Sequence, residues 1–91
     1  MRFVVSGHSM EPNFQEGQTV LVSYLPYLFR PPKISDVVVI KDPRSRRLLL
    51  KRITNTKSKK YFVAGDNPKS STDSRTFGSI NKENILGKVI F

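Results

Sequence analysis

The chain has 91 residues and a net charge of +9, from 16 Lys and Arg against 7 Asp and Glu. This length favours one small domain, residues 1–91, with a modest core and one active centre. The sequence has no cysteine and a single histidine, which excludes disulfides, cysteine nucleophiles and thiolate sites and argues against a histidine metal cluster, so we expect no metal and no cofactor.

Hydropathy and charge narrow the setting in which the chain works. The longest apolar runs fall far short of the roughly 20 residues that span a bilayer, and no signal-peptide pattern opens the chain. We therefore expect a cytoplasmic protein that is soluble or peripheral at the membrane surface. The basic surplus attracts nucleic acid, anionic lipid headgroups or acidic polypeptide, and charge alone neither chooses among them nor excludes a merely solvated surface.

Short apolar alternation and frequent turns predict a mostly β fold, a small sheet or barrel. The candidate strands are rich in β-branched and aromatic residues and cover residues 3–5, 19–24, 37–41, 48–53, 61–64 and 88–91. The Asp-Pro-Arg-Ser sequence at 42–45 predicts a turn, and residues 55–60 an exposed polar loop. Residues 79–85 favour a short helical turn capped by Ser79 or Asn81.

One segment, residues 24–32, combines prolines with aromatic side chains. The prolines exclude a central strand, and the aromatics are unexpectedly apolar for a loop. The part from Tyr24 to Phe29 is therefore a candidate contact for a partner or a membrane surface. The alternative is that these aromatics fold back and cap the small core, since a short chain needs its large side chains for burial.

Ser9 lies in the irregular segment Ser-Gly-His-Ser-Met-Glu-Pro, residues 6–12, directly after the first candidate strand. In such a segment backbone N–H groups can face a reacting carbonyl instead of a neighbouring strand. A lone serine in a loop is usually only polar, and its hydroxyl is a poor nucleophile until a base removes its proton. The interpretation of Ser9 as a nucleophile therefore depends on a partner elsewhere in the chain.

Lys51 is the candidate base, because strand alternation puts it on one face with Leu49 and Ile53, whereas Arg52 faces the other way. These apolar neighbours favour removal of water from the amine. To act near neutral pH its pKa must fall from about 10.4 to roughly 7–8, which burial can supply. The alternative is an edge-strand lysine whose stem packs while its ammonium reaches water.

His8 is the rival base, as the only imidazole in the chain. Side chains of adjacent residues diverge in extended backbone, so His8 is poorly placed to form a hydrogen bond with Ser9. We expect a substrate-side or surface role for it.

Residues 65–78 are dense in short hydrogen-bonding side chains, a composition typical of a structured loop. Asp73 and Arg75 have the right types for a fixed ion pair beneath a site, and a serine hydroxyl there can bond with the lysine amine. Taken alone, this segment is only a polar turn.

Together these segments resemble the type I signal peptidase family of Ser/Lys endopeptidases, over nearly the whole chain. The family's Ser-Met-x-Pro segment carries the nucleophile and matches Ser9, Met10 and Pro12. Its Lys-Arg pair carries the base and matches Lys51 and Arg52. Its Gly-Asp-Asn loop, which ends in Ser-x-Asp-Ser-Arg, matches Gly65, Asp66, Asn67, Ser71, Asp73, Ser74 and Arg75. A further segment, Gly-Asp followed by valines, matches residues 35–39 with serine in place of the glycine.

The resemblance implies supporting roles as well. Ser71 would orient the lysine, while Asp73 and Arg75 would brace the loop. Some family members place a serine two residues before the nucleophile to help bind the oxyanion. Here that position is Gly7, so the oxyanion would rest on backbone N–H groups of Ser9 and its neighbours.

From this sequence we also expect two departures from the family pattern: no membrane anchor before Ser9 and no extra β domain between Lys51 and Gly65. Compact members of this kind resemble the maturation proteases of nickel-type superoxide dismutase, which remove a short leader from a precursor polypeptide. The resemblance implies that Lys51 takes the proton of Ser9, which attacks the scissile carbonyl. We expect the substrate to bind as an extended strand along the sheet.

Three other functions remain open. A minimal type I signal peptidase that acts on secretory precursors would look similar. A self-cleaving domain like those of SOS-response repressors shares the Ser/Lys dyad, although this chain shows neither a DNA-binding domain nor an evident linker to cut. A noncatalytic basic binding module has only the charge and scattered aromatics in its favour, and we do not expect nucleic acid as the partner.

Overall fold

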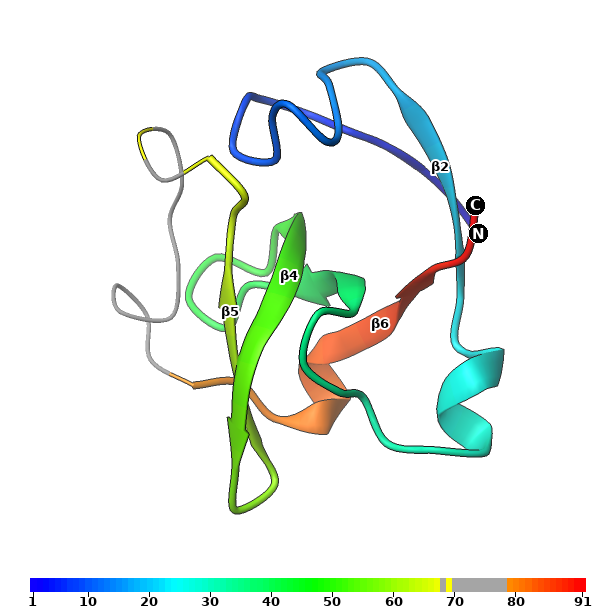
Figure 1. Cartoon of the computed structure of the whole chain (residues 1–91), viewed down its shortest axis with the longest axis vertical. Helices are drawn as coiled ribbons and strands as arrows, with labels where there is room; N and C mark the ends of the chain where they lie inside the picture. The colour runs from blue at the N-terminus through cyan, green and yellow to red at the C-terminus, as the bar shows by residue number, and fades with distance from the viewer. Residues whose placement is uncertain (68, 70–78) are drawn as a thin grey trace.

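The computed structural model describes residues 1–67, 69 and 79–91, and within them the chain forms six strands and two short 3-10 turns (Figure 1). The strands are β1 (Arg2–Val4), β2 (Thr19–Ser23), β3 (Val37–Lys41), β4 (Leu48–Lys57), β5 (Lys60–Ala64) and β6 (Ile85–Val89). The 3-10 turns are η1 (Leu25–Leu28) and η2 (Lys82–Asn84). These strands pair antiparallel in the order β1-β2-β6-β3-β4-β5, which confirms the mostly β prediction.

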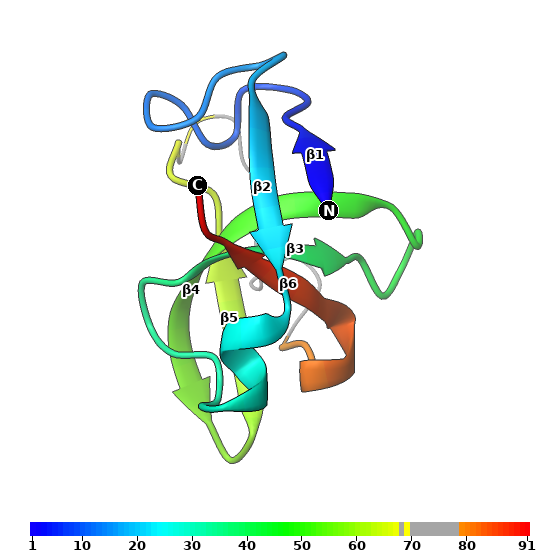
Figure 2. The same cartoon turned by 90° about the vertical axis from the view of Figure 1, so that its right-hand side faces the viewer.

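The sheet is curled, and its middle strand is buried on both faces. Val38 and Ile40 of β3 pack into one apolar cluster, whereas Val39 between them packs into another. The first cluster contains Tyr27, Val38, Ile40, Ile53, Tyr61, Val63, Ile80 and Ile85. The second contains Val5, Met10, Val20, Val22, Val39 and Leu50. Figure 2 shows β4 bending from its pairing with β3 to its pairing with β5, and the latter register shifts between Ile53 and Asn55, an irregularity that bends a strand.

The exposed loop predicted for residues 55–60 is wrong. β4 continues to Lys57, pairs it with Lys60 of β5, and leaves only Ser58 and Lys59 as the turn. Both turn residues have left-handed backbone, with φ of 51° and 67°. Such a tight turn usually carries Asn-Gly, and without that signal the polar side chains of a solvent-exposed hairpin read as a loop.

The last strand is displaced from the predicted 88–91 to Ile85–Val89. Gly87 lies at its centre, and glycine argues against a strand on propensity. The reason for glycine there is the close approach of β2: a Cβ at this position would lie 2.8 Å from Val22 Cγ1 and 3.0 Å from the Ser23 carbonyl group. The close crossing of the two strands therefore requires the residue that hides the strand from sequence analysis.

Two turn predictions are confirmed. Asp42 Oδ1 accepts a hydrogen bond from the Arg44 backbone N–H at 2.8 Å and so builds the turn between β3 and β4. Asn81 is the N-cap of η2, and its backbone N–H donates to Asn84 Oδ1 at 3.1 Å. In the portion of the chain that the structure covers, no helix has the length and apolar character needed to cross a membrane.

In the segment from Tyr24 to Phe29, one aromatic side chain caps the core and others are exposed. Tyr27 folds back into the first cluster, as the core-capping alternative expects, whereas Leu28 and Phe29 are exposed. The Tyr27 hydroxyl donates to Asp36 Oδ2 at 2.7 Å, and Arg30 Nη1 donates to the same oxygen at 3.1 Å. Asp36 thus ties η1 to the start of β3.

Burial alone would raise the pKa of Asp36, but the hydrogen bonds from Tyr27, Arg30 and the Lys33 backbone N–H outweigh it and hold the pKa below its ordinary value. A depressed carboxylate pKa stabilises the fold at pH values above the unfolded pKa of about 3.9. That contribution is lost as the pH falls through the folded-state pKa of Asp36.

Replacing Tyr27 with phenylalanine removes the hydroxyl that donates to this buried carboxylate. We expect Tyr27→Phe to lower the free energy of unfolding by about 2 kcal/mol near neutral pH. The loss should shrink in acid, well below about pH 4, where the carboxylate becomes neutral. Urea unfolding at both pH values measures it, and equal losses would show that the hydroxyl does not act on the charge of Asp36.

Candidate active site

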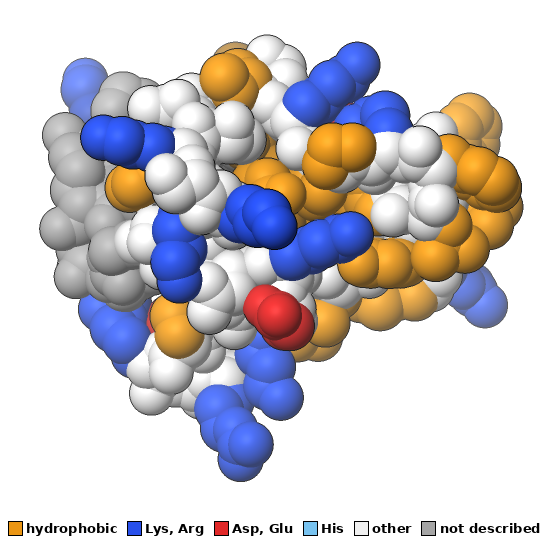
Figure 3. Space-filling view, turned by 90° about the horizontal axis from the view of Figure 1, so that it is seen from below, with side chains coloured by type: hydrophobic (Ala, Val, Ile, Leu, Met, Phe, Trp, Pro, Cys, Tyr) orange, Lys and Arg blue, Asp and Glu red, His pale blue; other side chains and the backbone are white. Residues whose placement is uncertain are grey.

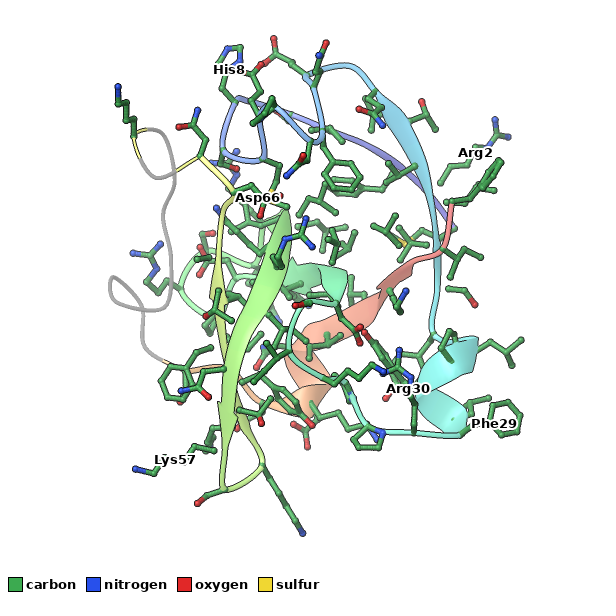
Figure 4. All side chains as sticks on the ribbon, viewed as in Figure 1. Arg2, His8, Phe29, Arg30, Lys57 and Asp66 are labelled. Atoms are coloured by element: carbon green, nitrogen blue, oxygen red, sulfur yellow. The ribbon has the colours of Figure 1, made fainter. Side chains whose placement is uncertain are left out.

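Segments that follow the two edge strands of the sheet meet at one end of the molecule. The turn after β1, residues 6–14, lies against the loop after β5, residues 65–67, and beside the first half of β4. Figure 4 shows Asp66 between the turn that carries His8 and the upper end of β4. Three segments that the sequence analysis singled out are therefore joined here.

Asp66 is held on both sides. Its two carboxylate oxygens accept from Arg52, Oδ1 from Nε and Oδ2 from Nη2, each at 2.8 Å. Oδ2 also accepts from Asn13 Nδ2 at 2.9 Å. This two-pronged guanidinium–carboxylate geometry fixes orientation as well as distance. Asp66 thus connects β4 to the turn after β1, and we call Arg52, Asp66 and Asn13 the clamp.

The loop after β5 also holds the backbone around Ser9. The Asn67 backbone N–H donates to the Ser9 carbonyl at 2.8 Å, and Asn67 Nδ2 donates to the His8 carbonyl at 3.1 Å. Met10, which is almost fully buried in the second cluster, accepts at Sδ from the Asp66 backbone N–H at 3.4 Å. The backbone of the Ser9 turn is therefore fixed by hydrogen bonds and by the packing of Met10.

Charge reinforces the clamp. The Arg52 guanidinium holds the pKa of Asp66 below its ordinary value, against the opposing effect of burial, and Asn13 lowers it further. The hydrogen bonds of Asp66 in turn raise the pKa of Arg52. Since the carboxylate pKa is depressed, the clamp contributes fully above the unfolded pKa of about 3.9 and is lost as the pH falls through the pKa of folded Asp66.

Ser9 is half-buried on the wall of a small cleft of about 40 Å³. The cleft lies between the first strand, the Ser9 turn and the start of β4, and is lined by Phe3, Val5, Ser6, Ser9, Met10, Arg47, Leu48, Leu49 and Leu50. Within the described part of the chain, the backbone N–H groups of Ser9 and Met10 have no hydrogen-bond acceptor. They remain free to donate to an oxygen in the cleft.

Lys51 directly follows the β4 residues that line this cleft. It is only 2% exposed, on an inner strand that pairs with β3 on one side and β5 on the other. The predicted alternation is confirmed, because Leu49 and Ile53 share the first cluster whereas Leu50 belongs to the second. Burial also overturns the alternative of an edge-strand lysine that reaches water.

His8 lies on the surface of the turn. Its exposed ring has Nδ1 2.8 Å from Glu11 Oε2, and this hydrogen bond, with the carboxylate charges of Glu11 and Glu16, raises the pKa of His8. The neighbouring Gly7 has a left-handed φ of 80°, which glycine adopts at no steric cost, and its backbone N–H donates to Glu16 Oε2 at 3.0 Å. The Gly7 amide is therefore already engaged.

Three predicted supporting residues, Ser71, Asp73 and Arg75, lie outside the described residues. Asn13 was missed by the sequence analysis, although its place next to Pro12 in a turn is one where an asparagine amide commonly makes hydrogen bonds. Across the described residues, no three His, Asp or Glu side chains are grouped so as to hold a metal ion.

The serine at position 35, where the resembled family has glycine, has a left-handed φ of 80°. This explains a preference for glycine, since an L side chain is strained there. The Ser35 carbonyl accepts from Arg52 Nη1 at 3.1 Å, so this turn supports the clamp from the other side.

Comparison with known proteins shows the family to which the chain belongs. The model of the signal peptidase, peptidase S26, family matches residues 1–57 and 54–91. The two matched ranges overlap at residues 54–57, the last four residues of β4. Together they cover the whole chain.

The chain is similar to signal peptidase I V of Bacillus subtilis, with 28% identity over 96% of this chain and 82% of that protein. It is 26% identical to thylakoidal processing peptidase 1 of Arabidopsis thaliana, over 91% of this chain but 38% of that protein. A shorter match, 56% identical over 32 residues, relates it to signal peptidase IB of Staphylococcus aureus and covers 17% of that protein. The chain therefore spans much less than two thirds of several of these relatives. It belongs to the signal peptidase, peptidase S26, family of serine endopeptidases.

Proposed function

We propose that the chain removes an amino-terminal leader or propeptide from a precursor protein, with Ser9 as nucleophile and Lys51 as general base. The observation that carries the proposal is the cleft, which has Ser9 on its wall and is also lined by Leu49, the β4 residue that shares a strand face with the buried Lys51. A buried amine favours its uncharged form, in which nitrogen can accept a proton. The similarity to signal peptidase I V and to a thylakoidal processing peptidase supports leader removal as the reaction.

In the proposed mechanism, Lys51 Nζ accepts the Ser9 Oγ proton while the oxygen attacks the scissile carbonyl. The backbone N–H groups of Ser9 and Met10 donate to the oxyanion that forms. When the tetrahedral intermediate collapses, the protonated amine gives its proton to the leaving amino group. Water then attacks the acyl-enzyme while Lys51 accepts a proton from it. When the second tetrahedral intermediate collapses, Lys51 returns this proton to Ser9 Oγ, and the leader leaves as a carboxylic acid that ionises in water.

The substrate binds as an extended strand beside β1. β1 is an edge strand in the described sheet, so one side of its backbone is open to a further strand. Phe3 of this strand and Val5 after it line the cleft that contains Ser9. A peptide paired with β1 would therefore carry its side chains toward the cleft and its carbonyl groups past Ser9.

The precursor of a nickel-type superoxide dismutase is the substrate that we propose first. Its support is the compactness of the core. β4 is joined to β5 by a turn of two residues, as we expected from the absence of an extra β domain between Lys51 and Gly65. A secretory precursor is the second candidate, supported by the similarity to signal peptidase I V. Incubating the chain with each precursor, and identifying the new amino terminus by mass spectrometry, tests both. A chain that cleaves neither precursor would contradict the proposed reaction.

The dyad makes a direct prediction for single substitutions. Ser9→Ala and Lys51→Ala should each abolish cleavage of whichever precursor is processed, because one loses the nucleophile and the other the base. Lys51→Arg should also be inactive, since a guanidinium stays protonated. Circular dichroism and urea unfolding check that each variant is folded. Substantial activity in a folded variant would remove that residue from the mechanism.

The clamp predicts a second effect on activity. Asp66→Asn should lower the free energy of unfolding by about 1–3 kcal/mol, because Arg52 loses its charged partner. In the folded enzyme it should also lower the turnover rate about tenfold or more, because small displacements of reacting groups are costly. Precursor cleavage at saturating substrate measures this effect.

Asn13→Ala separates position from stability. It removes the exposed hydrogen bond between the Ser9 turn and Asp66 and leaves the Arg52 pair in place. We expect a lower turnover rate with little loss of stability. Gln15→Ala is the matched control, because Gln15 is an exposed amide directly after the same turn. Equal rates for the two variants would show that the clamp does not position the turn.

A further inference from the structure

The 3-10 turn η1 exposes large apolar side chains. Leu25 is 59% exposed, Leu28 65% and Phe29 84%. These three residues, which we call the apolar tip, are the first and last residues of η1 and its C-cap. Figure 3 shows hydrophobic side chains gathered at the end of this face where η1 lies. A contiguous exposed patch of this kind marks a contact surface more often than single exposed residues do.

The tip is held rigidly rather than free to fold onto the core. Tyr27, between Leu25 and Leu28, is buried and bonded to Asp36. The Arg30 guanidinium lies 5.5 Å from the centre of the Tyr27 ring and donates to the same carboxylate. The side chain that could have buried the turn is therefore already used, and Leu28 and Phe29 stay in water.

A basic groove adjoins the tip. Its volume is about 640 Å³, and its lining residues are Pro31, Ser58, Lys59, Lys60, Tyr61, Asn81, Lys82 and Glu83. Pro31 is two residues beyond Phe29, so the groove begins where the tip ends. Three of the lining side chains are lysines and one is acidic. Figure 3 shows several basic side chains on this side of the molecule. Lys60 donates to Asn81 Oδ1 within the groove.

One of these lysines has a backbone conformation that favours glycine over lysine. Lys59 has left-handed backbone with φ of 67° in the hairpin turn, where glycine is favoured. Strained backbone of this kind clusters at functional sites, which indicates that the side chain of Lys59 has a function at the rim of the groove. Here that side chain brings one more positive charge to the groove.

We propose that the apolar tip and the lysine groove together dock the protein onto a bilayer that contains anionic phospholipids. The tip enters the boundary of the acyl chains, and Lys59, Lys60 and Lys82 meet the lipid phosphates, a combination that binds membrane surfaces. The net charge of +9 has the sign that this surface requires. A second copy of the chain is the poorer occupant, because a two-fold contact would bring lysines against lysines.

This docking leaves the cleft with Ser9 away from the bilayer. In Figure 4, Phe29 and Lys57 mark the end of the molecule opposite His8, the neighbour of Ser9. The site would therefore stay open to substrates in solution. Docking also does not depend on the proposed dyad, so either proposal can fail without the other.

The test is co-sedimentation of the full chain with vesicles of phosphatidylcholine alone or mixed with phosphatidylglycerol. We expect binding to the mixed vesicles that weakens with added salt, and little binding to the neutral ones. Phe29→Ser should weaken binding about tenfold or more, because the apolar side chain no longer enters the lipid. Phe91→Ser is the matched control, since Phe91 is 89% exposed but belongs neither to the tip nor to the groove lining, and it should leave binding unchanged.

Lys59→Gly tests the groove without a loss of folding. It should weaken binding about fivefold, while its urea midpoint stays equal or rises, because glycine relieves the left-handed backbone. Arg2→Gln removes an equal charge from β1 and should change binding much less. Absence of binding to the mixed vesicles, or equal losses in the control variants, would overturn the proposal. So would an effect of Phe29→Ser on self-association alone, measured by analytical ultracentrifugation.

Discussion

The bidentate pair between Arg52 and Asp66 is the contact on which the site depends. The described sheet has β1 and β5 at its edges, and the segments that follow these two strands lie against each other. Asp66 bridges them, because Arg52 holds one side of the carboxylate and Asn13 the other. Since Arg52 is the strand neighbour of Lys51, the same pair fixes the turn of Ser9 relative to the buried amine.

The two proposals place the chemistry and the membrane contact at opposite ends of the molecule. The cleft uses apolar walls and free backbone N–H groups around Ser9, where exclusion of water strengthens electrostatic interactions. The opposite end carries the apolar tip and the groove lysines, where charges stay in water and cost little. Asp36 supports the second end as Asp66 supports the first. In each case hydrogen bonds from an arginine and from neutral donors hold the carboxyl pKa below its ordinary value.

Much of this could be predicted from the sequence, wherever a local pattern reflected the tertiary structure. The alternation around Lys51 predicted its burial, because Leu49 and Ile53 on the same strand face pack in one cluster. The β4–β5 hairpin was missed, because Ser58 and Lys59 adopt left-handed backbone without the Asn-Gly pair that usually marks such a turn. The predicted bounds of β6 were displaced, because the glycine at position 87 is required by the close approach of β2 and disfavours a strand on propensity. Asn13 was missed because its partner Asp66 is far away in the sequence.

The central claim is that the amine of Lys51 lies beside the side chain at position 9, and a thiol placed there measures it directly. The chain has no cysteine, so Ser9→Cys introduces a unique thiol whose ionisation can be followed by its absorbance or its rate of alkylation. An adjacent amine that takes up the thiol proton becomes a cation beside the thiolate, and this ion pair lowers the thiol pKa below its ordinary value of about 8.5. The account predicts a clear difference between Ser9→Cys alone and Ser9→Cys with Lys51→Met, in which the thiol should return toward that ordinary value. Identical titrations in the two variants would contradict it.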